Sequence, residues 1–252
     1  MHGLAQPRMN NLGDTDIHQA FARALPSAQW SSSPLLVTLV DASDWESCLP
    51  GALALLDPVE TTRMRRKRNQ GDREVLTLAY ALHRLLLGGV LGIDASAVPL
   101  WRDANGCPRV GDNLVHTSLS HAGRWIALAV STTGPVGVDI ESRERIGALP
   151  EIAGSICHPR EAADLVGITG GSYGEALLAL WVRKEALLKA AGVGLAREMS
   201  SFLAPEGELP LALEGAETTC VQMLDAGAAC LAAVAGPPGV RVALAWLDAH
   251  RQ

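Results

Sequence analysis

The sequence predicts an α+β protein made of two similar halves, each with a small antiparallel sheet and one long helix. Apolar residues recur at helical spacing in two long segments, at about 72–90 and about 174–191. Short β-rich segments come before and after each of these segments. The order of strand, long helix and strand pair therefore occurs twice along the chain, which predicts two halves that each bury one sheet against one helix.

Residues 1–33 are polar, with a weak helical pattern near 18–25, and we expect a poorly ordered leader there. The N-terminal half is expected at 34–134. Gly92 follows the long helix of this half, as glycine commonly does at helix ends. The other elements expected in this half are strands at 35–40, 98–101, 115–119 and 125–131, a helix at 44–57, and a turn at 103–108.

The C-terminal half is expected at 135–252. Pro159 divides its first helical region into two short pieces, and Gly192 closes its long helix. The other elements expected here are short helices at 149–157 and 159–166 and strands at 136–141, 219–224, 229–235 and 240–247.

A weak internal repeat supports the division into halves. The matching pairs are 37–41 with 138–141, 81–88 with 184–191, and 118–130 with 223–234. Such a repeat predicts a pseudo-twofold axis between the halves, and ligand sites commonly lie in clefts between packed units. Chance similarity between Ala- and Leu-rich segments is the alternative.

Bulk properties exclude several classes of protein. The net charge of −6 argues against general nucleic-acid binding. No run of 18 apolar residues is present, so we expect no membrane span, and the first 25 residues lack the apolar core of a signal peptide. The five cysteines are scattered and form no C-x-x-C pair, which indicates neither a disulfide framework nor a zinc site and favours a cytoplasmic location.

Three carboxylates and a lysine stand out in otherwise apolar segments. Asp139 and Glu141 are two residues apart on an expected strand and so share one face. Glu185 and Lys189 are four apart on an expected helix and also share a face. A Mg²⁺ ion that holds a phosphate would explain this set. The alternative is a turn at Asp139 and a solvated helix face at Glu185, since D-x-E is common.

Basic residues gather between 63 and 73, where guanidinium groups offer a fork geometry that suits phosphate. Most of these charges are expected on a solvated loop and helix start, with a few in contact with a ligand. Ser120 and His121 end a strand, where they can hydrogen-bond a phosphate. A Ser–His nucleophile pair is the alternative, but no G-x-S-x-G elbow accompanies it. Lys184 lies about 100° from the Glu185 face and is expected to reach solvent or a second ligand group.

Three motifs in order resemble the 4′-phosphopantetheinyl transferase superfamily, Sfp type. The first is Ser120-His121 followed by Trp125, and the second is the strand 136–141 with its D-x-E. The third is the segment W-x-x-K-E-A-x-x-K at 181–189. The resemblance covers about 35–248 and implies that family's fold, in which two halves imitate a dimer of smaller carrier-protein synthases.

The resemblance implies an enzyme that moves 4′-phosphopantetheine from coenzyme A to a serine of an acyl or peptidyl carrier protein and releases 3′,5′-ADP. Asp139, Glu141 and Glu185 would hold Mg²⁺. Glu185 would also accept the serine proton, and Lys189 would stabilise phosphate charge. Ser120 and His121 would contact the 3′-phosphate region, and Lys184 counts among the expected coenzyme A contacts.

One position departs from the family pattern. Gly-Lys-Pro often precedes the Ser-His segment in the family, but Cys107 stands in place of that lysine here. Arg109 is the expected substitute for its phosphate contact. Among the basic residues at 63–73, Arg66 and Arg73 are the favoured coenzyme A contacts.

The expected partners are coenzyme A and carrier proteins of fatty-acid, polyketide or peptide synthesis, with no nucleic acid or membrane, and the protein is expected to be a monomer. A non-catalytic coenzyme A- or carrier-binding homologue is the alternative suggested by Cys107. An unrelated Mg²⁺-dependent nucleotide-binding enzyme is a third reading, and it would not explain the duplicated halves.

Overall fold

The structure is a computed structural model that describes residues 16–25, 33–111, 113, 115–194, 197–211, 213 and 216–251. It is a mixed α+β fold built around two four-stranded sheets. The predicted leader at 1–15 and 26–32 lies outside the described residues. The prediction of a poorly ordered leader is wrong for residues 16–25, because α1 (Ile17–Ala24) is a helix whose apolar face packs into the core.

The first sheet has the strand order β10-β1-β5-β4. It comprises β1 (Leu35–Asp41), β4 (His116–Ala122), β5 (Trp125–Ser131) and β10 (Val242–Leu247). β1 pairs with β5 and β5 with β4 in antiparallel register, but β1 pairs with β10 in parallel. The prediction of an antiparallel sheet is therefore wrong for this half. β10 belongs to the segment 135–252 in sequence but to the first sheet in space, so a single cut at 134 does not separate the two sheets.

The second sheet has the order β6-β9-β8-β7 and is antiparallel throughout, as predicted. It comprises β6 (Gly137–Ser142), β7 (Gly207–Leu211), β8 (Thr219–Leu224) and β9 (Cys230–Gly236). The sequence analysis did not predict β7, which lies at the sheet edge.

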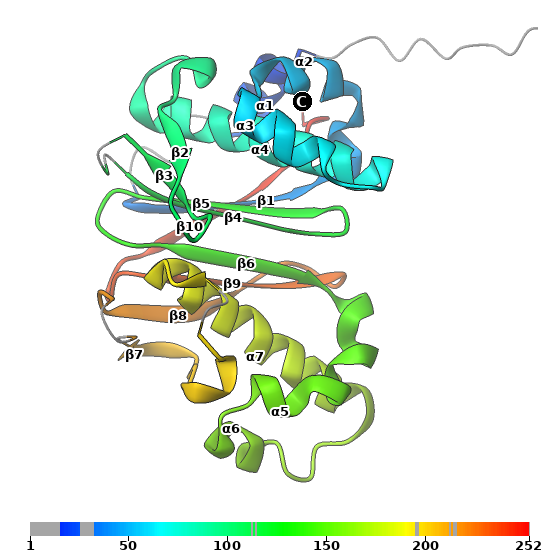
Figure 1. Ribbon diagram of the computed structural model, residues 1–252, viewed down its shortest axis with the longest axis vertical. Helices are drawn as coiled ribbons and strands as arrows, with labels where there is room; N and C mark the ends of the chain where they lie inside the picture. The colour runs from blue at the N-terminus through cyan, green and yellow to red at the C-terminus, as the bar shows by residue number, and fades with distance from the viewer. Residues whose placement is uncertain are drawn as a thin grey trace, which may run out of the picture.

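One long helix covers the outer face of each sheet (Figure 1). α4 (Gln70–Leu91) packs on the first sheet and α7 (Gly170–Ala191) on the second. Each has 22 residues, and each ends at a glycine in the left-handed region, Gly92 with φ 68° and Gly192 with φ 69°. In both halves the chain runs from strand to long helix to hairpin, and β1-β5-β4 matches β6-β9-β8 in sheet order.

The smaller elements connect these layers. They are η2 (Ala42–Cys48), α2 (Leu49–Leu55), α3 (Pro58–Arg65), η3 (Ala95–Ala97), β2 (Leu100–Arg102), β3 (Pro108–Val110), η4 (Arg143–Ile152), α5 (Ala153–Ile156), α6 (Pro159–Asp164) and η6 (Met199–Ser201). β2 and β3 form the hairpin expected around the turn at 103–108.

Strand alternation divides the core into three layers. On β5, Ile126 and Leu128 join the cluster under α4, whereas Ala127 and Ala129 join the cluster between the two sheets. The sheets therefore pack face to face through small and branched side chains, with a helix outside each (Figure 1).

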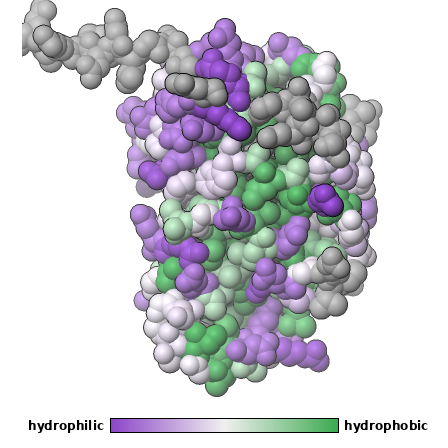
Figure 2. Space-filling view, turned by 180° about the vertical axis from the view of Figure 1, so that it is seen from behind, coloured by the Kyte–Doolittle hydropathy of each residue, from purple (hydrophilic) through white to green (hydrophobic). Residues whose placement is uncertain are grey.

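Among the described residues, α4 is the one helix long and apolar enough to span a membrane by length and composition, and 72% of its most apolar window is buried inside the protein. Figure 2 shows hydrophobic residues reaching the surface in the middle of the rear face, with hydrophilic residues around them. Leu244 and Trp246 on the edge strand β10 are two of the large apolar side chains that remain exposed.

Candidate active site

A glycine allows β6 and α7 to approach each other closely. A Cβ atom at Gly137 would lie 2.0 Å from the Ala186 carbonyl oxygen and 2.4 Å from the Ala190 nitrogen. No other residue type fits such an approach without moving one backbone away from the other. This contact brings the carboxylates of β6 next to the functional face of α7.

The two β6 carboxylates face α7, as their spacing predicts. Val138 and Ile140 belong to the cluster between the sheets, so Asp139 and Glu141 point to the opposite side. Glu185 lies across from them on α7, and the charges of both β6 carboxylates act on it. The structure therefore brings the three predicted acidic residues into one site.

Asp139 is the centre of a buried hydrogen-bond network. Ser120 Oγ on β4 donates to Asp139 Oδ1 at 2.6 Å, and Lys189 Nζ reaches the same oxygen at 2.6 Å. Lys189 Nζ also donates to Ser120 Oγ at 2.8 Å and to the Val138 carbonyl oxygen at 3.1 Å. All three ammonium hydrogens thus have acceptors, while Asp139 Oδ2 is buried without a partner among the described residues.

Glu141 is paired with a residue that the sequence analysis did not single out. Arg145 Nη1 bonds Glu141 Oε1, and the Arg145 guanidinium lies 4.1 Å from the centre of the Trp181 ring. Burial and the charge of Asp139 raise the pKa of Glu141, and Arg145 partly opposes that rise.

Glu185 is the acidic residue most affected by its surroundings. Burial, and after it the charge of Asp139, raise its pKa to about 7 against the lowering effect of Lys189. A carboxyl whose pKa lies near neutrality is suited to accept and release a proton at physiological pH.

The chemistry of this donor set fits a hard divalent cation. Carboxylate oxygens are its preferred ligands, and the orphaned Asp139 Oδ2 is a buried atom that lacks an interaction. Among the described residues, no three acidic, histidine or cysteine side chains converge on one point as they stand. Mg²⁺ completes its shell with water and phosphate oxygens, so the three carboxylates need not converge fully before the ion and its phosphate ligand are bound.

A cavity of about 400 Å³ opens beside these residues. Glu185 and Lys189 from α7 line one wall, and Arg102, Cys107 and Arg109 from the β2–β3 hairpin line the other. Acidic residues that suit a cation thus lie next to guanidinium groups that suit phosphate. This size and composition suit a ligand with several phosphate groups.

The hairpin wall is fixed to the end of α7. Asn105 Nδ2 donates to the Gly192 carbonyl oxygen at 2.7 Å, which satisfies one acceptor at the helix end. Asp103 holds the Arg109 guanidinium at 2.8 Å. Arg109 and Cys107 both line this cavity, and the phosphate contact expected of Arg109 stays a prediction.

Several known proteins of one family are similar to this chain. Residues 135–226 match the 4′-phosphopantetheinyl transferase superfamily. The chain is 29% identical over 194 residues to the 4′-phosphopantetheinyl transferase HetI of Nostoc sp., covering 75% of this chain and 82% of that protein. It is 26% identical to Sfp of Bacillus subtilis, over 67% and 75% of the two chains.

A further 4′-phosphopantetheinyl transferase of Bacillus subtilis is 31% identical over 160 residues, covering 57% of this chain and 69% of that protein. The chain belongs to the 4′-phosphopantetheinyl transferase superfamily. The matched region of this transferase contains β6 and α7, and so all three acidic residues and Lys189.

Ser120 and His121 of the transferase lie in different surroundings, because neighbouring strand residues point to opposite faces. Ser120 bonds Asp139 and Lys189, which places it at the carboxylates. His121 is half-buried, and burial together with the charges of Lys67 and Lys189 lowers its pKa. The two residues predicted to share one contact region are thus separated across β4.

The expectation for Lys184 is wrong. Its side chain is fully buried, and its ammonium group donates to the carbonyl oxygens of Met199 and Phe202, each at 2.7 Å. It also pairs with Glu161 at 2.6 Å. The face of α7 that carries Lys184 is covered by α6 and the 198–204 segment, so this lysine reaches neither solvent nor the cavity.

Replacing Lys184 with methionine is expected to destabilise the transferase by about 3 kcal/mol, because it leaves the largely buried Glu161 carboxylate without its cation. The backbone N–H groups of His158 and Ala204 still donate to Glu161, which keeps the loss at the low end of the range for broken buried pairs. Urea unfolding followed by circular dichroism measures the change. Arg160→Gln on the exposed face of α6 is the control and should change stability by less than about 0.5 kcal/mol.

Arg66 and Arg73 are not among the described residues that line the cavity. Arg66 caps the C-terminus of α3 and is exposed. Arg73 Nη1 donates to the carbonyl oxygens of Lys67 and Arg68, each at 3.1 Å, and so ties together the loop before α4. The expected coenzyme A contact of both residues stays a prediction.

Two arginines of the site were missed by the sequence analysis. Arg102 pairs with Pro108 in the hairpin register and lies 5.4 Å from the Tyr80 ring centre. Burial lowers its pKa. The sequence contained a signal for Arg102, because it directly precedes the predicted turn at 103–108. The residue before a hairpin turn lies beside the residue at the end of that turn, here Pro108. Arg145, four positions after Glu141, had no such signal.

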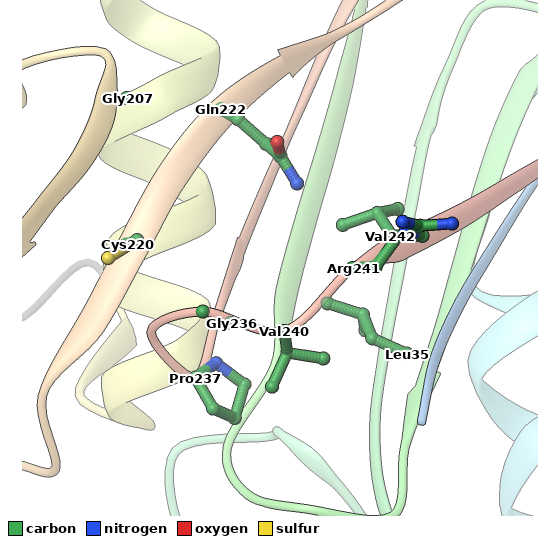
Figure 3. Close-up of a pocket in the computed structure, with 10 residues that line it drawn as sticks. Leu35, Gly207, Cys220, Gln222, Gly236, Pro237, Val240, Arg241 and Val242 are labelled. Carbon is green, nitrogen blue, oxygen red and sulfur yellow. The ribbon is translucent and has the colours of Figure 1, made fainter. Parts of the chain in front are cut away.

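A second cavity of about 400 Å³ lies between β8 and the β9–β10 connection (Figure 3). Leu35, Val240 and Val242 line it, with Gln222 and Arg241 as polar side chains. No carboxylate is among its described lining residues, so it lacks the donor set of the first cavity.

Proposed function

We propose that this protein transfers 4′-phosphopantetheine from coenzyme A to a serine of an acyl or peptidyl carrier protein and releases 3′,5′-ADP. The observation that carries the proposal is the gathering of Asp139, Glu141, Glu185 and Lys189 beside a cavity lined by arginines. These groups suit a pyrophosphate that must be held while one of its bonds is broken.

Coenzyme A is the donor, and its phosphates lie against the hairpin wall. Arg109 offers a fork of N–H donors, and Asp103 holds it in place. Arg102 supplies a second guanidinium, and it is partly desolvated, which strengthens its attraction for phosphate. The two arginines take the role that a lysine at position 107 would have.

Transfer depends on Mg²⁺ held by Asp139, Glu141 and Glu185. When bound, the cation neutralises pyrophosphate oxygens and stabilises the charge that develops in the transition state. Asp139 Oδ2 is buried and has no hydrogen-bond partner within the part of the chain that the structure describes, so it is available to such a ligand.

In the reaction, the carrier serine hydroxyl forms a bond to the β-phosphorus, and the bond from that phosphorus to the bridging oxygen breaks. Glu185 accepts the serine proton, directly or through water, which suits a carboxyl with a pKa of about 7. Lys189 exchanges its hydrogen bond with Ser120 for one to the phosphate oxygen of the departing 3′,5′-ADP. His121, beside Lys67, lies near the nucleotide end of the donor.

The carrier docks at the mouth of the cavity, and the basic run at 63–68 steers its acidic surface during encounter. One chain holds every residue of the site, so the protein acts as a monomer. It works in the cytoplasm, without nucleic acid or membrane. The two halves are related by a pseudo-twofold axis, for which the matching sheet orders and the two 22-residue helices are the support.

The test is to incubate the protein with coenzyme A, Mg²⁺ and several purified apo carrier proteins, and to weigh the carriers by mass spectrometry. A phosphopantetheine adduct on the carrier serine is expected, and it should disappear when EDTA replaces Mg²⁺. If no carrier acquires the adduct, the transferase proposal fails, and a non-catalytic coenzyme A- or carrier-binding role is favoured. If the adduct forms equally in EDTA, the metal requirement alone fails.

A further inference from the structure

The two β6 carboxylates are held in the same manner. In each, one oxygen bonds a basic or hydroxyl partner. Ser120 and Lys189 hold Asp139 Oδ1, and Arg145 holds Glu141 Oε1. The second oxygen of each carboxylate, Asp139 Oδ2 and Glu141 Oε2, has no hydrogen-bond donor among the described residues.

Arg145 is itself held from two sides. Arg145 lies in η4, the helix that directly follows β6, four positions after Glu141 in the sequence. The turn from β6 into η4 brings its guanidinium back to the Glu141 carboxylate. Its other support is the Trp181 ring at 4.1 Å, one helical turn before Glu185 on α7. Arg145 therefore links the strand and the helix that carry the three carboxylates.

This arrangement differs from an ordinary surface ion pair. An exposed pair alone contributes little, because solvent screens it and both side chains lose freedom. Here the Arg145 side chain is only 34% exposed and that of Glu141 17%, and the cation–π contact with the Trp181 ring holds the guanidinium in place. Arg143, two residues earlier, pairs instead with Glu175 and has no such platform among the described residues.

We propose that Arg145 is a positioning residue, which orients Glu141 so that one oxygen is presented to the cation site, as Ser120 and Lys189 orient Asp139. Residues that hydrogen-bond a metal ligand fix its direction, and their loss weakens metal binding without removing any ligand. The inference rests on the proposed function, because it assumes a cation at the three carboxylates.

The test measures Mn²⁺ binding by electron paramagnetic resonance, with coenzyme A present, in wild type and four variants. Arg145→Gln should bind Mn²⁺ about 10-fold more weakly. Arg145→Lys should lie between, since lysine keeps the charge but neither the fork nor the stacking. Trp181→Leu should bind about threefold more weakly. Arg143→Gln is the matched control and should bind as wild type does.

Thermal unfolding confirms that each variant is folded, and raised Mg²⁺ should restore transfer by Arg145→Gln. The inference is overturned if Arg145→Gln binds Mn²⁺ as tightly as wild type, or more tightly, or if Arg143→Gln loses as much. A wild type that modifies carriers but binds no Mn²⁺ overturns the inference and leaves transfer standing. A wild type that binds Mn²⁺ with the expected variant order but modifies no carrier supports the inference and refutes the transferase proposal.

Discussion

Replacing Glu185 with glutamine is expected to lower kcat/KM for carrier modification by about 10²- to 10³-fold. Glutamine keeps the size of the side chain but cannot accept the serine proton or offer a charged oxygen to a cation. Glu185 is half-buried and the charges of Asp139 and Lys189 act on it, so its loss removes the proton acceptor of the proposed reaction. Initial rates of adduct formation at saturating Mg²⁺ measure the loss.

The matched control is Glu175→Gln on the same helix. Glu175 is exposed and pairs with Arg143, away from the carboxylate site, so its rate should stay within about twofold of wild type. The fold should survive both changes, because Glu185→Gln removes repulsion with Asp139 and Glu141. A Glu185→Gln variant that modifies the carrier at the normal rate would refute the catalytic role of Glu185.

The parts of the site that could be read from the sequence are those set by local periodicity. Asp139 and Glu141 share a face because a strand repeats every two residues, and Glu185 and Lys189 share one because they lie four apart on a helix. Both relations hold in the structure, where Lys189 reaches Asp139 at 2.6 Å. Neither relation depends on how distant parts of the chain pack.

The errors arise where long-range packing decides. Lys184 lies on a polar-looking side of α7, but the 198–204 segment covers that side and its carbonyl groups bind the ammonium. The hydrogen bonds from Arg73 to two carbonyl oxygens of the loop before α4 also had no sequence signal, and its coenzyme A contact stays a prediction. β10 pairs in parallel with β1, so residues from opposite ends of the chain lie side by side, and no local sequence pattern predicts this pairing.

Gly137→Ala is the second change with a large expected effect, and we expect a loss of about 4 kcal/mol in the free energy of unfolding. The added methyl group would lie 2.0 Å from the Ala186 carbonyl oxygen and 2.9 Å from Lys189 Cβ. These are a backbone atom and the first atom of a side chain, so no flexible group can move aside. The helix must shift away from β6, which opens the core of the C-terminal half. Urea unfolding measures the loss.

The same shift of α7 should also slow transfer in the molecules of Gly137→Ala that remain folded. Moving α7 carries Glu185 and Lys189 away from Asp139, so the folded fraction of Gly137→Ala should transfer phosphopantetheine at least about 10²-fold more slowly than wild type. Gly154→Ala is the control, because a Cβ there meets nothing within 4 Å, and it should be neutral or slightly stabilising. Wild-type stability in Gly137→Ala would mean that α7 does not rest on β6 at this glycine. Wild-type rates in its folded fraction would mean that the close approach does not set the spacing of the acidic residues and Lys189.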